Sequence, residues 1–292
     1  MPTKPPLVGM KTHFPFQVSI CAWVDLLGYG AEIKEAGYNP LDPKAKAAVK
    51  RIRQFHQVVA DHSLRDFPTL VMNDGATAYR DLSYRTRWTT YDFVQRSFRL
   101  FQHIQRIEKE LGEPGARMVV AVGFRLRGRA SQSSELRGRY VKSLISAVND
   151  GTLSIEEGIT RASKFRRNFD LVPQLQANFA FTKAYIAEQS GSKGGLSGPR
   201  FFLDDLTLDF AKLEQNDVGV SDRIGWNAGD YGLSANFLVV DKVRSAKQTE
   251  QRNGKTQNHG PESFRDALEI ARYLSGDQRV LEALRQARKE KS

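Results

Sequence analysis

The chain carries VSICAWVDLLGYG at residues 18–30 and PTLVMNDGATAY at residues 68–79, and these two stretches decide its expected fold. The first predicts a buried strand that ends at Asp25, and the second predicts a hairpin with Asp74 at its tip. If the two strands are neighbours in one sheet, both carboxylates lie at one end of it. Two hard oxygen ligands so placed could hold a divalent ion against a triphosphate.

Each aspartate also has a simpler interpretation. A lone carboxylate at the end of an apolar strand costs on the order of several kcal/mol to bury, so Asp25 either binds metal or caps the turn that follows. The turn Asn73-Asp74-Gly75 is favourable hairpin chemistry without any ligand, because tight turns need positive φ. The residues alone leave both interpretations open.

The spacing of apolar residues and the helix caps predict the order of elements. The order strand, helix, two strands, helix, strand is typical of a ferredoxin-like or palm arrangement. We therefore expect an α+β fold with an antiparallel sheet, helices on one face and a C-terminal helical extension. The expected strands are 15–27, 68–72, 76–80, 117–126, 199–203 and 234–242, and the expected helices are about 42–61, 89–111, 134–148, 154–167, 174–189, 261–274 and 277–290.

The same pattern divides the chain into four parts. Residues 1–14 form an N-terminal arm, 15–243 the palm domain, 244–260 a polar loop and 261–292 the C-terminal helices. Apolar residues recur at helical spacing in the last part. That apolar face has to be covered either by the sheet or by a second chain.

Composition places the chain among globular proteins. It has 292 residues, of which 40% are hydrophobic and 26% charged, so we expect a packed core. No apolar run reaches the roughly 20 residues of a membrane helix, and the N-terminal residues carry no signal-peptide core. The single cysteine, Cys21, cannot form an internal disulfide. These observations predict a cytoplasmic protein without a membrane partner.

The formal net charge of +11 has two explanations. A surplus of cations favours a polyanionic partner, either nucleic acid or the phosphates of a nucleotide. A solvated surface rich in arginine accounts for the charge equally well, because the basic residues are spread along helices and no tail gathers them.

In order and in motif, residues 15–205 resemble the class III nucleotide cyclase domain. The family's first strand ends Asp-Ile-x-Gly-Phe, and this chain has DLLGY at residues 25–29. The family's hairpin turn is Gly-Asp, where this chain has NDG at residues 73–75. The family's helix Val-Asn-x-Ala-x-Arg corresponds to ANFAFT at residues 177–182, after an apolar strand at 118–126.

The chain is more similar still to a scattered group of uncharacterised prokaryotic proteins related to cyclases. Those proteins typically read Phe-x-Asp-x-Leu-Gly-Phe and Ser-Asp-Ser, then Arg-Gly-x-Ile, Ala-Tyr-x-x-Glu and Pro-Arg-Ile. The counterparts of the last three motifs are RG at residues 127–128, AYIAE at 184–188 and PRF at 199–201. Cyclase relatives recur in prokaryotic signalling and antiviral defence.

The resemblance implies a substrate, a metal and a set of site residues. The substrate would be a nucleoside triphosphate, the metal Mg²⁺ or Mn²⁺, and the site would lie at the interface of a homodimer. The implied residues are the metal ligands Asp25 and Asp74, the catalytic residues Asn178 and Lys183, and the phosphate-binding residues Arg127 and Arg200.

Two positions depart from the cyclase pattern. Thr182 stands where the family has the arginine that stabilises the transition state, and the nearest cation, Lys183, is one step further round the helix. Leu70 stands where purine cyclases carry the lysine or glutamate that selects the base. A leucine cannot read a base edge, so the choice of base is not implied.

The residues without the resemblance give plainer roles. Asn178 and Lys183 would be surface positions of a helix, and Arg127 an exposed residue of a turn. Arg200 would form an ion pair with Glu188.

Two classes of function follow from the sequence. The first is a divergent nucleotide cyclase or nucleotidyltransferase that acts on a nucleoside triphosphate through a metal held by two aspartates. The alternative is a palm-like domain that has lost catalysis and binds nucleotide, nucleic acid or a protein partner, within a larger complex to which the C-terminal helices would dock.

Overall fold

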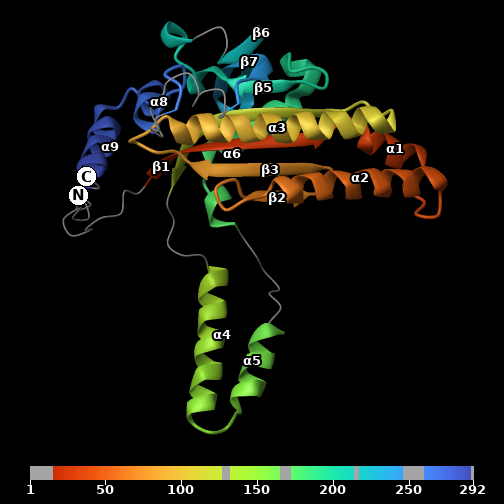
Figure 1. Ribbon diagram of the computed structural model, residues 1–292, viewed down its shortest axis with the longest axis vertical. Helices are drawn as coiled ribbons and strands as arrows, with labels where there is room; N and C mark the ends of the chain where they lie inside the picture. Colours follow the sequence, from red (N-terminus) through yellow and green to blue (C-terminus); the bar gives the residue numbers. More distant parts are fainter. Residues whose placement is uncertain (1–15, 127–131, 165–171, 214–216, 246–259, 291–292) are drawn as a thin grey trace.

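The computed structural model describes residues 16–126, 132–164, 172–213, 217–245 and 260–290. Its body is built on a seven-stranded sheet in the order β2-β3-β1-β4-β5-β7-β6 (Figure 1). The strands are β1 (Phe16–Leu26), β2 (Thr69–Met72), β3 (Gly75–Asp81), β4 (Ala116–Leu126), β5 (Phe201–Asp204), β6 (Val218–Ala228) and β7 (Leu233–Val243).

Strand β1 lies between β3 and β4 and pairs antiparallel with both. The pairs β2–β3, β5–β7 and β6–β7 are also antiparallel, whereas β4 and β5 run parallel. The expected α+β class and the order around the hairpin are therefore confirmed. The sheet is mixed rather than purely antiparallel, because the helical segment between β4 and β5 returns the chain to the end of the sheet where β4 begins.

The helices follow the expected order with shifted boundaries. Asp42 caps the first long helix as expected, its side chain accepting a hydrogen bond from the backbone N of Lys44 (2.8 Å). A short helix after β1 and the edge strand β6 have no counterpart in the expectation, and the helix expected at 261–274 begins at Ala267. The helices are α1 (Tyr29–Glu35), α2 (Pro43–His62), α3 (Trp88–Leu111), α4 (Gln132–Asn149), α5 (Ile155–Ser163), α6 (Phe179–Ser190), α8 (Ala267–Leu274) and α9 (Gln278–Glu290).

Helices cover both faces of the sheet, not one face as expected. In β1, Val18 and Ile20 belong to the main core, which α2, α3 and α8 complete. Trp23 of β1 and Val119 of β4 belong to a second core, which α6 completes. A Cβ at Gly123 of β4 would lie 2.6 Å from the backbone N of Ala180, so glycine is required for this close approach of α6.

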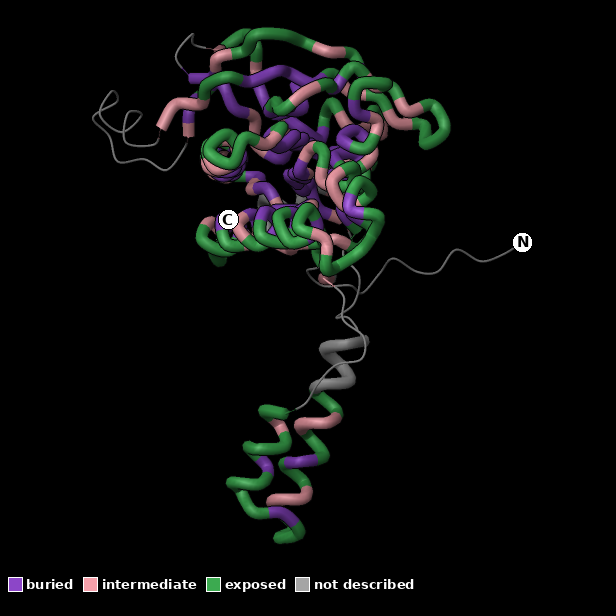
Figure 2. The backbone as a smooth tube through the Cα atoms, turned by 90° about the vertical axis from the view of Figure 1, so that its right-hand side faces the viewer, coloured by how far each residue is buried: buried purple, intermediate pink, exposed green. Residues whose placement is uncertain are grey.

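The C-terminal segment is part of the main core. Phe264, Ala267 and Ile270 are fully buried there, and Glu269 forms an ion pair with Arg87 (2.7 Å). The apolar face of 261–274 is thus covered by the body of the same chain. Figure 2 shows the buried positions concentrated in that body.

Helices α4 and α5 form a hairpin that projects from the body (Figure 1). They occupy the segment between β4 and α6, inside the stretch expected to be one palm domain. The expected N-terminal arm at 1–14 and most of the polar loop at 244–260 lie outside the described residues. No helix among the described residues combines the length and the apolar character needed to cross a bilayer.

Candidate functional site

The structure brings Asp25 and Asp74 to the same end of the sheet. Asp25 is paired across β1 and β3 with Gly75, the residue that follows Asp74. The backbone N of Leu26 donates a hydrogen bond to the carbonyl oxygen of Asp74 (3.1 Å), which fixes the hairpin tip against the end of β1. The expectation that the two strands are neighbours is therefore confirmed.

The hairpin tip has the backbone that the sequence predicts. Asn73 has φ of 56°, and its side-chain amide donates to Oδ1 of Asp74 (2.9 Å). A Cβ at Gly75 would lie 2.6 Å from the Trp23 ring and 3.3 Å from Oδ1 of Asp25. Glycine at this position thus lets the hairpin lie directly against the two side chains of β1.

The Asp25 carboxyl is in an environment that opposes its charge. Its pKa is raised to about 8, first by burial and then by the neighbouring carboxylates of Glu188 and Asp74, against the opposing effect of Arg117. Among the described residues, no side chain forms a hydrogen bond or an ion pair with this carboxylate. A cation supplied from outside the chain would therefore relieve an unfavourable arrangement.

Arg117 and Glu188 complete this cluster, and the sequence did not assign either to the site. Arg117 is paired across β1 and β4 with Asp25, and its Nη1 donates to the backbone O (3.0 Å) and to Oε1 (3.2 Å) of Glu188 in α6. Arg117 thus takes the partner that was expected for Arg200. Burial raises the pKa of Glu188, and Arg117 is the main opposing influence.

The donor set at this sheet end fits a hard divalent cation that arrives with a substrate. The described residues contain no group of three or more His, Cys, Asp or Glu side chains placed to hold a metal ion. Mg²⁺ commonly takes only one or two protein carboxylates and completes its shell with phosphate oxygens and water. Asp25 and Asp74 supply that minimum, and the cluster sets three carboxyl groups beside one arginine.

Asn178 holds the start of α6. Its Oδ1 accepts from the backbone N of Phe181 (3.1 Å), and its Nδ2 donates to Ser19 Oγ (3.1 Å) and to the carbonyl oxygen of Gln174 (2.8 Å). The residue is 2% exposed. Asn178 is therefore a buried helix cap that joins α6 to β1, and the catalytic role implied by the resemblance stays a prediction.

Lys183 forms a buried ion pair. Its Nζ lies 2.7 Å from Oδ2 of Asp204 at the end of β5, and the side chains are 8% and 0% exposed. Asp204 also accepts hydrogen bonds from the backbone N of Val122 (3.2 Å) and of Leu206 (3.1 Å). The charge of Lys183 is thus balanced within the chain, and the catalytic role implied by the resemblance stays a prediction.

Arg200 is exposed at the start of β5, on the far side of β4 from Asp25. It lines a hollow of about 460 Å³ beside α3, together with Gln105, Arg106 and Lys109. Arg127 lies outside the described residues. The phosphate-binding roles of both arginines stay predictions.

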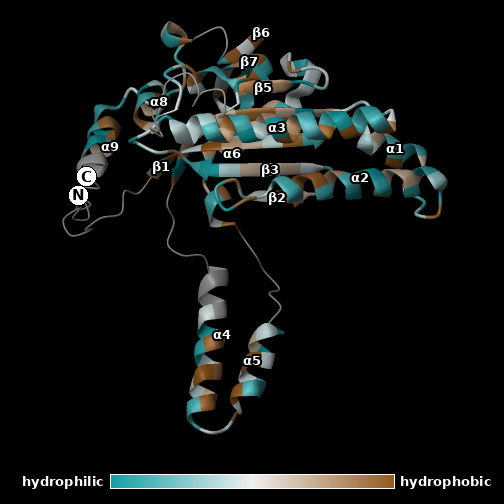
Figure 3. Ribbon diagram, viewed as in Figure 1, coloured by the Kyte–Doolittle hydropathy of each residue, from teal (hydrophilic) through white to brown (hydrophobic). Residues whose placement is uncertain are grey.

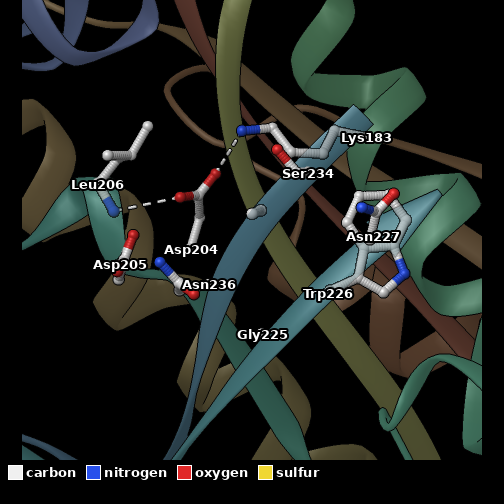
Figure 4. Close-up of a pocket in the computed structure, with 10 residues that line it drawn as sticks. Lys183, Asp204, Asp205, Leu206, Gly225, Trp226, Asn227, Ser234 and Asn236 are labelled. Atoms are coloured by element: carbon white, nitrogen blue, oxygen red, sulfur yellow. Dashed lines mark hydrogen bonds and ion pairs between the residues drawn. The ribbon is translucent and has the colours of Figure 1, made fainter. Parts of the chain in front are cut away.

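A second hollow, of about 430 Å³, lies beside the Lys183–Asp204 pair. Figure 4 shows Lys183 and the backbone of Leu206 converging on Asp204, with the side chains of Asn227, Ser234 and Asn236 nearby. The lining comes from α6, β5, β6 and β7, and β4 separates these strands from Asp25 on β1. One chain therefore has an acidic cluster and a polar pocket at different places on the sheet.

Comparison with known proteins gives only distant structural likeness. No protein-family model and no curated protein matches the sequence. Solved structures with a similar fold include the guanylyl cyclase Cya2, at 13% identity and a TM-score of 0.43, over 79% of this chain and 95% of that one. The guanylate cyclase domain of RhGC from Catenaria anguillulae in complex with GTP has 7% identity and a TM-score of 0.41, over 78% and 98%.

A bacterial light-regulated adenylyl cyclase is similar over 92% of this chain and 57% of its own, at 10% identity and a TM-score of 0.43. At values this low, the function of the chain has to be argued from its own residues.

Proposed function

We propose that the chain binds a nucleoside triphosphate together with a divalent cation at Asp25 and Asp74, as a divergent nucleotide cyclase or nucleotidyltransferase. One observation carries the proposal. The carboxyl of Asp25 is buried beside Asp74 and Glu188, with its pKa raised to about 8, and no described side chain pairs with it. Such a carboxyl is unfavourable when charged, and a bound cation would relieve this cost.

In this proposal the two carboxylates hold the cation and the chain positions the rest. Bound Mg²⁺ or Mn²⁺ would supply charge neutralisation at the phosphates and at the pyrophosphate that leaves. Arg117, held by Glu188, places a guanidinium on the strand beside Asp25, where phosphate oxygens would lie. In a cyclase reaction the ribose 3′-oxygen bonds to the α-phosphorus, its proton passes to a base, and the bond from that phosphorus to the leaving pyrophosphate breaks.

A homodimer belongs to the same proposal. The acidic cluster and the polar pocket beside Lys183 lie on different strands of one chain, with β4 between them. A second copy would bring its own polar pocket to the acidic cluster of the first. A role in prokaryotic signalling or antiviral defence follows from the resemblance alone.

A second candidate function is nucleotide binding without turnover. It is favoured by the Lys183–Asp204 pair, because the cation nearest to the family's transition-state arginine is already neutralised in the interior. Thr182 stands at the family's arginine position and carries no charge. Its hydroxyl donates to the carbonyl oxygen of Asn178 (3.2 Å). Such a domain would keep the metal and the triphosphate and lack the group that stabilises the developing charge.

The experiment separates binding from turnover. Calorimetry with each of the four common nucleoside triphosphates and Mn²⁺ measures binding, and pyrophosphate release measures turnover. Asp25→Asn should lower the metal-dependent affinity at least tenfold, whereas Asp230→Asn, which changes an exposed carboxylate in the turn Gly229–Tyr231, should leave it unchanged.

Each result assigns the chain to one function. Binding with pyrophosphate release supports the enzyme, and binding without release supports the inactive domain. Equal affinity of wild type and Asp25→Asn for every triphosphate would overturn both.

A further inference from the structure

The hairpin of α4 and α5 is internally well formed. Ser154 caps α5 by accepting from the backbone N of Glu157 (3.2 Å), whose side chain in return accepts from the backbone N of Ser154 (3.1 Å). Leu144 and Leu153 are buried between the helices, at 9% and 7% exposure. A Cβ at Gly158 would lie 3.0 Å from Cγ2 of Val148, so the two helices are in close contact.

The hairpin nevertheless leaves an apolar surface uncovered. Ile145, Ile155 and Ile159 are 54%, 68% and 65% exposed. They border an apolar hollow of about 250 Å³ between the helices, which Val141, Leu144 and Val148 also line. Figure 3 shows this hydrophobic character along both helices of the projecting hairpin. Two short helices cannot bury such a face by themselves, so a further element has to cover it.

The charges of the hairpin are divided along its length. The end remote from the body carries the acidic residues Asp150, Glu156 and Glu157. The part nearer the body carries the exposed basic residues Arg139, Lys142, Arg161 and Lys164. A surface with opposite charges at its two ends is complementary to itself when two copies meet head to tail.

We infer that the apolar face of α4 and α5 docks on the same face of a second copy, in antiparallel orientation, to form a four-helix bundle. The antiparallel arrangement places the acidic end of each hairpin against the basic part of the other, whereas a parallel arrangement would place like charges together. The inference rests on residues of the hairpin alone and is independent of the proposed nucleotide site.

Lys142 and Asp150 are the pair that the antiparallel bundle brings together. A two-fold axis perpendicular to the helices places α4 of one copy against α4 of the other. Helices rise about 1.5 Å per residue, so Lys142 lies about 10 Å before the end of α4, and Asp150 directly follows that end. The apolar hollow, which Val141 and Asn149 line, extends between these two levels. An axis through its middle therefore places Lys142 of one copy beside Asp150 of the other.

Crosslinking between two different variants tests the contact directly. One preparation carries Lys142→Cys and the other Asp150→Cys, with the second tagged so that the chains differ in mass. The native Cys21 is 0% exposed and burial raises its pKa to about 12, so it does not compete. Mild oxidation of the mixture should give a disulfide-linked pair of unlike chains, and either preparation alone should give none.

Several outcomes would overturn the inference. A linked pair that forms equally well from one variant alone would show contact without the antiparallel register. The absence of any linked pair in the mixture, while circular dichroism shows unchanged helix content, would show that the hairpins do not meet. Because the link reports this contact alone, dimerisation through another surface cannot produce it.

Sedimentation then measures the dissociation constant of the dimer, and so the contribution of this contact to its affinity. Ile159→Glu changes a side chain that is exposed in the single chain, so it should raise the dissociation constant at least tenfold without unfolding the hairpin. Lys142→Glu should also raise it, and Lys142→Glu with Asp150→Lys should bring it back towards the wild-type value. Equal dissociation constants for wild type, Ile159→Glu and Lys142→Glu would contradict the bundle.

Discussion

At the scale of single residues, the energetics of the site are dominated by the cost of charging Asp25. The sequence predicted this cost, because Asp25 follows an apolar strand. It did not predict Arg117 and Glu188, which are 71 residues apart and meet only because α6 crosses β4. An arginine near the start of a buried strand is only a weak indication of a functional site. The folded structure is needed to identify the carboxylate that it contacts.

The raised pKa of Asp25 predicts a stability that falls as pH rises. The pKa is about 8 in the folded chain, against 3.8 for an ordinary aspartate, so between these values the folded state binds more protons than the unfolded state. The contribution of Asp25 is therefore fully present below pH 4 and lost as pH rises through 8. With partial solvent screening the loss should be on the order of 2–3 kcal/mol.

Urea unfolding of metal-free protein between pH 5 and pH 9 checks this. Asp25→Asn should be more stable than wild type at pH 9 and should have the shallower pH dependence. The difference between the two curves isolates Asp25, because Glu188 titrates in both proteins. A parallel pair of curves would show that Asp25 is not in an unfavourable environment. Asp230→Asn is the control, and its curve should follow that of wild type.

At the scale of elements, the sequence predicted six of the seven strands and missed β6. Strand β6 lies at the edge of the sheet, and most of its side chains are exposed, with Val218 and Trp226 buried. It therefore carries little apolar alternation. Helix α6 was predicted as a helix, but not as the cover of a second face, because apolar spacing gives no information about which face of a sheet a helix covers.

The Lys183–Asp204 pair should be a main attachment of α6 to β5. Lys183→Met leaves the Asp204 carboxylate, which is fully buried, without its cation, and should lower the free energy of unfolding by about 3–5 kcal/mol. Lys183→Met with Asp204→Asn should recover part of this loss, since an amide oxygen can still accept from Leu206 and no buried charge remains. Urea unfolding at neutral pH measures both variants.

The opposite result would also be informative for function. A loss below about 1 kcal/mol in Lys183→Met would mean that the pair is readily separated. Lys183 would then be available to a substrate, as the resemblance to cyclases implies.

At the scale of the whole molecule, periodicity predicted that the C-terminal helices have an apolar face but could not say what covers it. The structure shows that the body of the same chain covers α8. The same pattern predicted helices near α4 and α5, and there the apolar face is left exposed. Whether an apolar helix face is covered depends on which elements lie near it in the folded chain, and the spacing of residues along the sequence does not show this.

Removal of residues 261–292 should therefore unfold the protein rather than change its assembly alone. The deletion takes away Phe264, Ala267 and Ile270, each 0% exposed, and opens the main core against β1 and β4. Burial of a large apolar side chain contributes about 1.5–3 kcal/mol, so the summed loss approaches the 5–15 kcal/mol that stabilises a typical domain.

Deleting only 278–292 removes α9, from which Leu281 joins the core, and should lower the melting temperature without abolishing folding. Thermal melting followed by circular dichroism compares the two deletions with the full chain, and a cooperative melt of the longer deletion at the wild-type temperature would show that α8 is not needed for the core.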